Sequence, residues 1–330
     1  MKQTETEQTD TPTDVPGEPD QTTNGFDPRW LTLREAVDHA VRPSHLVPRF
    51  ASSPEMLQVV DLACGTGSNL RYLSPLLPAP QRWLLLDYDE GLLAEAGRRC
   101  SAWIAGQGWA DTVSVDTRRC DLSAGLPAAV LDSTTNPGHD QEREPLMVTA
   151  SALADLVSRE WLEGFAHQLA SGDRVAAVLL ATVYNGDVSF CPADPDDEAV
   201  IAAFHRNMHR DKGFGPALGA DAARSVSEIF ARNWTVVEAD STWILDESCR
   251  RRMGAADFDR LLEFQLGFFV DAAMTEGFDA SDWGERRRLQ RTGGQLTIRV
   301  GHTDVLAQRL PDHHPRGADR ANTPSRIPTA

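Results

Sequence analysis

Three aspartates each follow an apolar or strand-like segment in the first half of the chain. Asp61 follows an apolar run, Asp87 directly follows Leu84-Leu85-Leu86, and Asp121 comes shortly after a third segment. A carboxylate can accept hydrogen bonds from a ribose diol or from an amino group. If the segments are neighbouring strands of a parallel sheet, their carboxyl ends lie at one edge, where such sheets bind ligands. The spacing therefore predicts a crevice lined by three acids.

A glycine turn, Gly65-Thr66-Gly67, follows Asp61 and leads into a helix-like segment. Glycine lets a ligand approach the main chain, and a helix N-terminus offers free N–H groups to an anion. Asp87 comes twenty residues after Gly67, close to the spacing of a ribose-binding acid. A nicotinamide dehydrogenase is a weaker hypothesis, because Leu70 stands where the dinucleotide motif has its third glycine.

The segment from Asp61 to Asn69, Asp-Leu-Ala-Cys-Gly-Thr-Gly-Ser-Asn, resembles motif I of class I S-adenosylmethionine (SAM) dependent methyltransferases. The resemblance covers about residues 56–182; segments 153–158 and 211–219 extend it to a bacterial subgroup without a defined substrate. It implies transfer of the SAM methyl group to an acceptor. Motif I would then hold the cofactor, Asp87 its ribose and Asp121 its adenine. The expected cofactor-binding residues are Arg34, Asp61, Ala63, Gly65, Gly67, Asn69, Asp87, Tyr88, Asp121, Leu122 and Ser151.

Strand-like and helix-like segments alternate along the chain. Such alternation is typical of an α/β fold, a doubly wound, mostly parallel seven-stranded sheet; the resemblance implies its Rossmann-like methyltransferase version. We expect strands at 56–63, 83–87, 112–117, 146–151, 174–182, 235–245 and 295–306, and helices at 28–39, 69–76, 90–106, 159–169, 196–210 and 257–275. A single domain would span 26–309, with a core at 56–182 and additions at 185–222 and 248–292 covering the ligand edge. The polar segments 1–25, an acidic tail, and 310–330 are expected to be disordered.

Composition narrows the choice of partners. The formal net charge of −17 argues against a nucleic-acid backbone and favours a small-molecule acceptor. The basic run 286–288 is expected to be a solvated helix face. Five dispersed cysteines suggest neither a disulfide framework nor a zinc site. No secretory signal or bilayer-spanning run is evident, so we expect a cytoplasmic enzyme without a membrane partner. The sequence gives no indication of the oligomeric state.

The residues that would contact the methyl acceptor are harder to predict than those that would bind the cofactor. Tyr184 should end the fifth strand at the ligand edge, and His205 and His209 lie four apart on a helix, so these three are the catalytic candidates. A metal site at the two histidines would need a third ligand, and none is evident. Methyl transfer itself needs alignment of the acceptor, and a base only if the acceptor must lose a proton.

Several residues allow a structural interpretation as well. Asp87 could cap a helix and Asp121 could be a turn residue. Arg34 could pair with Asp38, four residues on, rather than with the SAM carboxylate. Asp155 could pair in the same way with Arg159, and we favour that pairing. At the level of the whole protein, the alternative is a SAM-binding protein without turnover that acts as a regulatory or scaffold partner.

Overall fold

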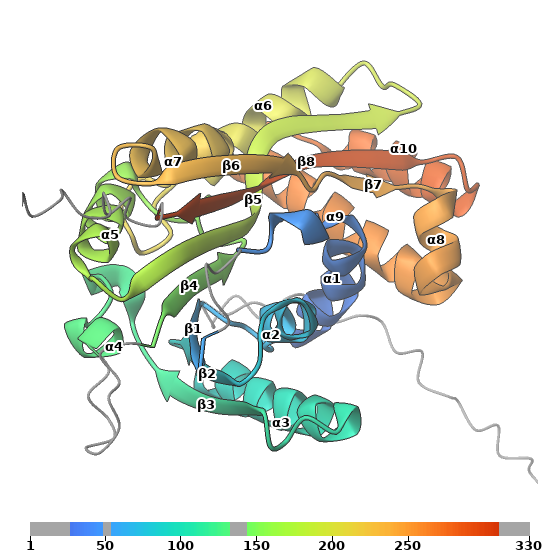
Figure 1. Cartoon of the computed structure of the whole chain (residues 1–330). Coiled ribbons are helices and arrows are strands. Elements are labelled where there is room, and N and C mark those ends of the chain that lie inside the picture. Colours follow the sequence, from blue (N-terminus) through green and yellow to red (C-terminus); the bar gives the residue numbers. More distant parts are fainter. Residues whose placement is uncertain (1–26, 49–53, 133–143, 310–330) are drawn as a thin grey trace, which may run out of the picture.

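A single mixed sheet organises the protein. The computed structural model describes residues 27–48, 54–132 and 144–309, so the two expected tails lie outside the described residues. The strands lie in the order β3-β2-β1-β4-β5-β8-β6, with β7 paired to β8 (Figure 1). Only the pairs made by β8 are antiparallel. The strands are β1 (Leu57–Leu62), β2 (Gln81–Asp87), β3 (Val113–Arg119), β4 (Leu146–Ser151), β5 (Val175–Cys191), β6 (Thr235–Asp240), β7 (Trp243–Leu245) and β8 (Thr297–Gln308).

Several helices begin at a residue whose side chain caps them. The side chains of Asp27, Asp89 and Ser158 accept hydrogen bonds from the first free N–H groups of α1, α3 and α5. The expected helices are confirmed, with ends that differ by a few residues. The helices are α1 (Pro28–Val41), α2 (Ser68–Leu73), α3 (Glu90–Gln107), α4 (Ala128–Asp132), α5 (Arg159–Ser171), α6 (Asp197–Met208), α7 (Ala222–Phe230), α8 (Glu247–Met253), α9 (Ala255–Thr275) and α10 (Ser281–Thr292).

Apolar side chains fill both faces of the sheet. Every residue of β1 is buried, as a strand covered on both sides requires. On one face the core is built with α5 and α7, and on the other with α2 and α3. A third cluster joins α1, α6, α9 and α10 to the extended part of β5 and to β8. This third cluster holds α1 beside the carboxyl ends of the central strands (Figure 1).

Strand β5 differs from its expected extent. The sequence predicts an end at Thr182, but the strand continues to Cys191 and remains paired with β8. Register shifts between Leu180 and Val183 and between Tyr184 and Val188 absorb residues that resemble a turn. Tyr184 therefore lies within the strand and does not end it. Residues 185–191, expected in an addition, belong to the sheet.

The basic run 286–288 is not a solvated face, so that expectation is wrong. Arg287 has no exposed surface and pairs with Asp197 of α6. Arg286 pairs with Asp194 and Asp196, at 2.7 and 2.6 Å. These ion pairs attach α10 to the start of α6. Helix α7 is absent from the predicted elements, although its inward face is apolar.

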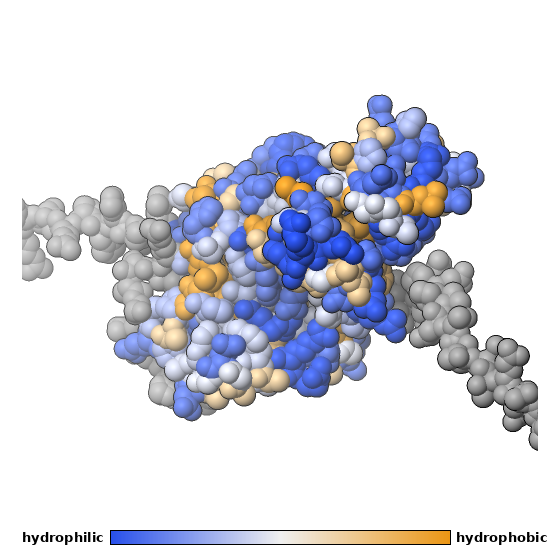
Figure 2. Space-filling model, turned by 90° about the vertical axis from the view of Figure 1, so that its right-hand side faces the viewer, coloured by the Kyte–Doolittle hydropathy of each residue, from blue (hydrophilic) through white to orange (hydrophobic). Residues whose placement is uncertain are grey.

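The face that contains α8 and α10 is mainly hydrophilic. Figure 2 shows hydrophobic residues there in small separate patches. Within the described ranges, no helix has both the length and the apolar character needed to cross a bilayer.

Candidate functional site

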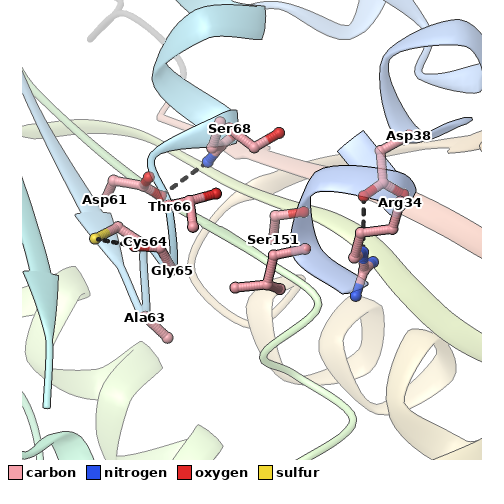
Figure 3. Close-up of a pocket in the computed structure, with 11 residues that line it drawn as sticks. Arg34, Asp38, Asp61, Ala63, Cys64, Gly65, Thr66, Ser68 and Ser151 are labelled. Atoms are coloured by element: carbon pink, nitrogen blue, oxygen red, sulfur yellow. Dashed lines mark hydrogen bonds and ion pairs between the residues drawn. The ribbon is translucent and has the colours of Figure 1, made fainter. Parts of the chain in front are cut away.

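A pocket lies where the strand order reverses. From β1 the chain proceeds to β2 and β3 on one side, whereas β4 and β5 lie on the other, so the crevice opens between the carboxyl ends of β1 and β4. The pocket has a volume of about 60 Å³. Figure 3 shows Ser151 of β4 between the loop after β1 and the α1 residues Arg34 and Asp38. Its lining is Leu31, Arg34, Asp38, Asp61, Ala63, Cys64, Gly65, Thr66, Ser68, Asn69 and Ser151.

The two glycines of the turn are required by the backbone. Gly65 and Gly67 have φ angles of +54° and +79°, in the left-handed region. A Cβ at Gly67 would lie 2.4 Å from Sγ of Cys100 on α3, and one at Gly65 would lie 3.2 Å from Leu31 of α1. The turn is therefore packed tightly against α3 on one side, while α1 lies over it on the other.

Asp61 has a carboxylate oxygen that lacks a partner. Its side chain is fully buried, and Oδ1 accepts a 2.9 Å hydrogen bond from Asn69 Nδ2. Within the part of the chain that the structure describes, Oδ2 accepts no hydrogen bond. Burial raises the pKa of Asp61 to about 7, although Asn69 and the charge of Arg42 both act to lower it. A buried carboxylate of this kind is suited to a cationic ligand group.

A buried polar network fixes this carboxylate from behind. Arg42, at the end of α1, donates to Asn69 Oδ1 at 2.8 Å and to Asp304 of β8 at 3.2 Å. Asn69 in turn bonds Thr149 of β4 at 2.9 Å. The other oxygen of Asp304 accepts the main-chain N–H of Thr182 at 2.8 Å. The network joins the start and the end of the described fold directly behind the pocket.

Asp87 holds the glycine turn and does not cap a helix. Its carboxylate accepts the N–H of Gly65 at 2.9 Å and that of Asp89 at 3.1 Å. Asp89 is the residue that caps α3, so the capping interpretation of Asp87 is wrong. Burial raises the pKa of Asp87 despite the hydrogen bonds to its charged form. The neighbouring Tyr88 has an exposed fraction of 46%.

Asp121 lies at the same edge of the sheet. The N–H of Cys120 bonds the carbonyl of Asp87 at 2.8 Å, which places the end of β3 beside the end of β2. The side chain of Asp121 accepts the N–H of Ser123 at 2.9 Å, so it also acts as the turn residue considered above. Leu122 is buried. Asp87, Tyr88, Asp121, Leu122 and Gly67 lie outside the lining of the pocket, whereas the other expected cofactor residues line it.

Arg34 does pair with Asp38, and it also lines the pocket. Its Nε lies 2.9 Å from Oδ2 of Asp38. The guanidinium stacks over the indole rings of Trp30 and Trp243, with its carbon 5.9 and 5.3 Å from their centroids. Trp243 also donates to the second oxygen of Asp38 at 2.9 Å. Arg34 is therefore held in place at the pocket wall.

The backbone is strained just after β1, just after β4 and within β5. Ala63 after β1, Ala152 after β4 and Thr182 in β5 have φ angles of +49°, +53° and +47°, although none is glycine. Each such residue costs about 1–3 kcal/mol, and strain of this kind gathers at functional sites. The hydroxyls of Ser151 and Thr182 bond each other at 2.6 Å within this strained region.

Of the three catalytic candidates, two are in contact. The hydroxyl of Tyr184 lies 2.8 Å from Nε2 of His205. Burial raises the pKa of Tyr184 well above its usual range and lowers the pKa of His205, which favours a phenol that donates to a neutral imidazole. His209 instead uses Nδ1 at 3.1 Å from the carbonyl of Ala217. Within the described ranges, no three His, Cys, Asp or Glu side chains are grouped as metal ligands would be.

Asp155 does not pair with Arg159, so the favoured pairing is wrong. Arg159 faces outward and lies 3.5 Å from Glu163 and 3.4 Å from Glu228. Asp155 is buried, and its Oδ1 accepts no hydrogen bond in the described ranges. Burial raises its pKa to about 6, against the opposing charge of Arg34. The only signal in the sequence was its place after the fourth strand, where small residues surround it.

The strand order now identifies the fold. In the order β3-β2-β1-β4-β5-β8-β6, strand β8 is antiparallel to both of its neighbours, and the pocket lies beside the glycine turn that follows β1. The chain has a doubly wound, Rossmann-like α/β fold. The expected doubly wound, mostly parallel sheet is confirmed, although the single strand expected at 235–245 is divided into β6 and β7.

Comparisons with known proteins reveal remote likenesses only. No family model and no curated protein matches the chain. Among solved structures, geranyl diphosphate C-methyltransferase from Streptomyces coelicolor A3(2) is 10% identical at a TM-score of 0.38, with 85% of this chain and 80% of that chain covered. A cyclopropane-fatty-acyl-phospholipid synthase-like protein from Lactobacillus casei ATCC 334 is 13% identical at 0.44, with 84% and 92% covered. Phosphoethanolamine N-methyltransferase 2 from Haemonchus contortus is 11% identical at 0.37, with 80% and 51% covered.

Proposed function

We propose that this protein is a SAM-dependent methyltransferase that acts on a small-molecule acceptor. One observation carries the proposal: the unpaired carboxylate oxygen of Asp61 lies in the same pocket as the guanidinium of Arg34. The amino-acid part of SAM has an ammonium and a carboxylate, which complement these two charges. The residues present therefore fit the cofactor.

The rest of the cofactor would extend along the strand ends toward β2 and β3. Asp87 has both oxygens oriented by main-chain N–H groups and keeps lone pairs for the two ribose hydroxyls. Tyr88 would border the adenine, and the carboxylate of Asp121 would accept its amino group. Main-chain atoms of Gly65 would lie against the cofactor, because this residue lines the pocket and has no side chain of its own.

Bound SAM supplies a methyl group already activated by a positive sulfur. The chain therefore has to align an acceptor and exclude water, tasks to which the buried cluster that contains Tyr184 would contribute. The pair Tyr184–His205 can take a proton outward, since Tyr184 is buried and His205 is half-buried. Nδ1 of His209 is already bonded to a main-chain carbonyl, so we assign this residue to packing.

Calorimetry with SAM, S-adenosylhomocysteine and NADH tests the cofactor. We expect the two sulfur nucleosides to bind and NADH not to bind; the reverse would refute the proposal. Incubation with labelled SAM and a bacterial metabolite extract then tests turnover. S-adenosylhomocysteine and products heavier by one methylene would support an enzyme. Binding without product from any extract would favour the alternative of a SAM-binding protein without turnover.

We further propose that the protein works in the cytoplasm. This location is supported by the cysteines, because all five are free thiols and four of them are buried.

A further inference from the structure

The pocket at the glycine turn has the size of one end of a ligand. Its volume of about 60 Å³ corresponds to about two water molecules' share of liquid volume. Polar side chains that line it therefore surround the same small space. Two hydroxyls beside the glycine turn belong to this lining, those of Thr66 and Ser68. Figure 3 shows both on the side of the loop after β1, with Arg34 of α1 opposite.

His39 of α1 determines the direction of the Ser68 hydroxyl. Nε2 of His39 lies 3.2 Å from the carbonyl oxygen of Ser68 and 3.0 Å from its Oγ. A carbonyl oxygen only accepts hydrogen bonds, so Nε2 must carry a proton. Burial lowers the pKa of His39, so the ring is neutral near pH 7 and this is its single proton. Oγ of Ser68 then also accepts from Nε2, and its own proton is free for another acceptor.

Thr66 offers a second hydroxyl to the pocket. Its side chain is 2% exposed, and within the described ranges its Oγ1 has no hydrogen-bond partner. A buried hydroxyl without a partner is costly, so a ligand that accepts its proton is favoured. Arg34 adds the positive charge, because among the described residues its pairing with Asp38 uses only Nε. Its two terminal nitrogens remain as donors at the pocket wall.

These donors match one of the two charged groups at the amino-acid end of the cofactor. An ammonium has only donors and meets the unpaired oxygen of Asp61, whereas a carboxylate has only acceptors. The free proton of Ser68 therefore suits the carboxylate, and hydrogen bonds to an ionised acceptor are the stronger kind.

We propose that Ser68 donates to the carboxylate of the bound cofactor, and that His39 is the positioning residue that keeps this hydroxyl turned to the pocket. The inference rests on the proposed function and deepens it. It names the residues that select a nucleoside whose amino-acid end has kept its carboxylate. Helix α1 then contributes twice, through the charge of Arg34 and through the orientation of Ser68.

Calorimetry with S-adenosylhomocysteine and with its decarboxylated analogue tests the role of Ser68. The analogue keeps the nucleoside and the ammonium and lacks only the carboxylate. We expect the wild-type protein to bind S-adenosylhomocysteine at least about tenfold more tightly than the analogue. Ser68→Ala should weaken S-adenosylhomocysteine binding about tenfold and change analogue binding less than twofold. Ser101→Ala, at an exposed serine of α3, is the matched control and should alter neither.

Two variants of His39 test its positioning role. His39→Leu should reduce the preference for the carboxylate about threefold, because nothing then holds the Ser68 oxygen away from the pocket. His39→Gln should restore the preference, since the amide nitrogen of glutamine can donate from about the position of Nε2. A merely structural role of His39 would weaken the binding of both nucleosides alike.

Equal wild-type binding of the two nucleosides, or an equal loss of both in Ser68→Ala, would overturn the inference and leave the proposed function standing. A full preference in His39→Leu would overturn the role of His39. Binding of the analogue shows that a variant is folded, and if Ser68→Ala does not fold, the two His39 variants decide the question. If neither nucleoside binds the wild-type protein, the proposed function fails and this inference fails with it.

Discussion

Replacing Asp61 by asparagine should weaken cofactor binding and at the same time stabilise the free protein. Both effects have one origin, a fully buried carboxylate with one oxygen unpaired. Its pKa is about 7 in the folded protein against 3.8 for an ordinary aspartate. Between these values the folded chain holds a proton that the unfolded chain has lost, so the free energy of unfolding falls as pH rises, and the loss is complete above about pH 7.

The size of the effect follows from the shift. Three pKa units correspond to about 4 kcal/mol of destabilisation at pH 8. Asparagine avoids this cost but places an unpaired amide at the position of Oδ2, which costs about 1–3 kcal/mol. We therefore expect the free variant to be about 1–3 kcal/mol more stable at pH 8 and to show less loss between pH 4 and 7. Without the negative charge it should bind S-adenosylhomocysteine about 10–100-fold more weakly.

Thermal unfolding without ligand and calorimetry with S-adenosylhomocysteine measure the two effects. The wild-type protein should bind about tenfold more weakly at pH 6 than at pH 8, because Asp61 is then mostly protonated while the ligand's ammonium keeps its charge. The variant should show little of this dependence, and Asp111→Asn, at an exposed aspartate outside the pocket lining, should behave as the wild type. A variant that binds as tightly as the wild type at pH 8 would refute the assignment of Asp61 to the ligand ammonium.

Three further changes probe the rest of the site. Gly67→Ala should destabilise the fold by about 1–3 kcal/mol in thermal unfolding, since its φ is +79° and the new Cβ would meet Cys100, whereas Gly106→Ala, in open space on α3, should stabilise it slightly. Asp87→Ala should weaken S-adenosylhomocysteine binding by about 1–3 kcal/mol by calorimetry; an unchanged constant would remove Asp87 from the site. Tyr184→Phe should slow methyl transfer about tenfold or more with S-adenosylhomocysteine binding unchanged, and weaker nucleoside binding would point to a structural role.

The residues expected to bind the cofactor can be predicted from the sequence because each lies in a short local pattern. The glycine turn, the aspartate at each strand end and the cap of α1 all lie within a few residues of the elements that they shape. The strand ends meet at one edge because the sheet is parallel there, which the alternation of segments already indicates. The roles of these residues toward the cofactor stay predictions.

The surroundings of the residues on the acceptor side cannot be predicted in this way, because they are formed by segments that are distant in the sequence. The loop of Asp155 is covered by the segment at Gly219, which is far away in the sequence. Residues 185–187 resemble a turn, and only pairing with β8 reveals a bulged strand. Arg287 reads as a surface residue until α6 supplies its carboxylate partner. In each case the partner, and not the local pattern, decides the environment.

The ion pair between Arg42 and Asp304 has a consequence for synthesis on the ribosome. Asp304 belongs to β8, the final strand of the described sheet, yet it braces the residues behind the pocket and fixes the main chain at Thr182. A nascent chain that carries the whole glycine turn but not β8 lacks this brace. Competence for the nucleoside should arise late in translation, once the closing strand has emerged and slotted between β5 and β6.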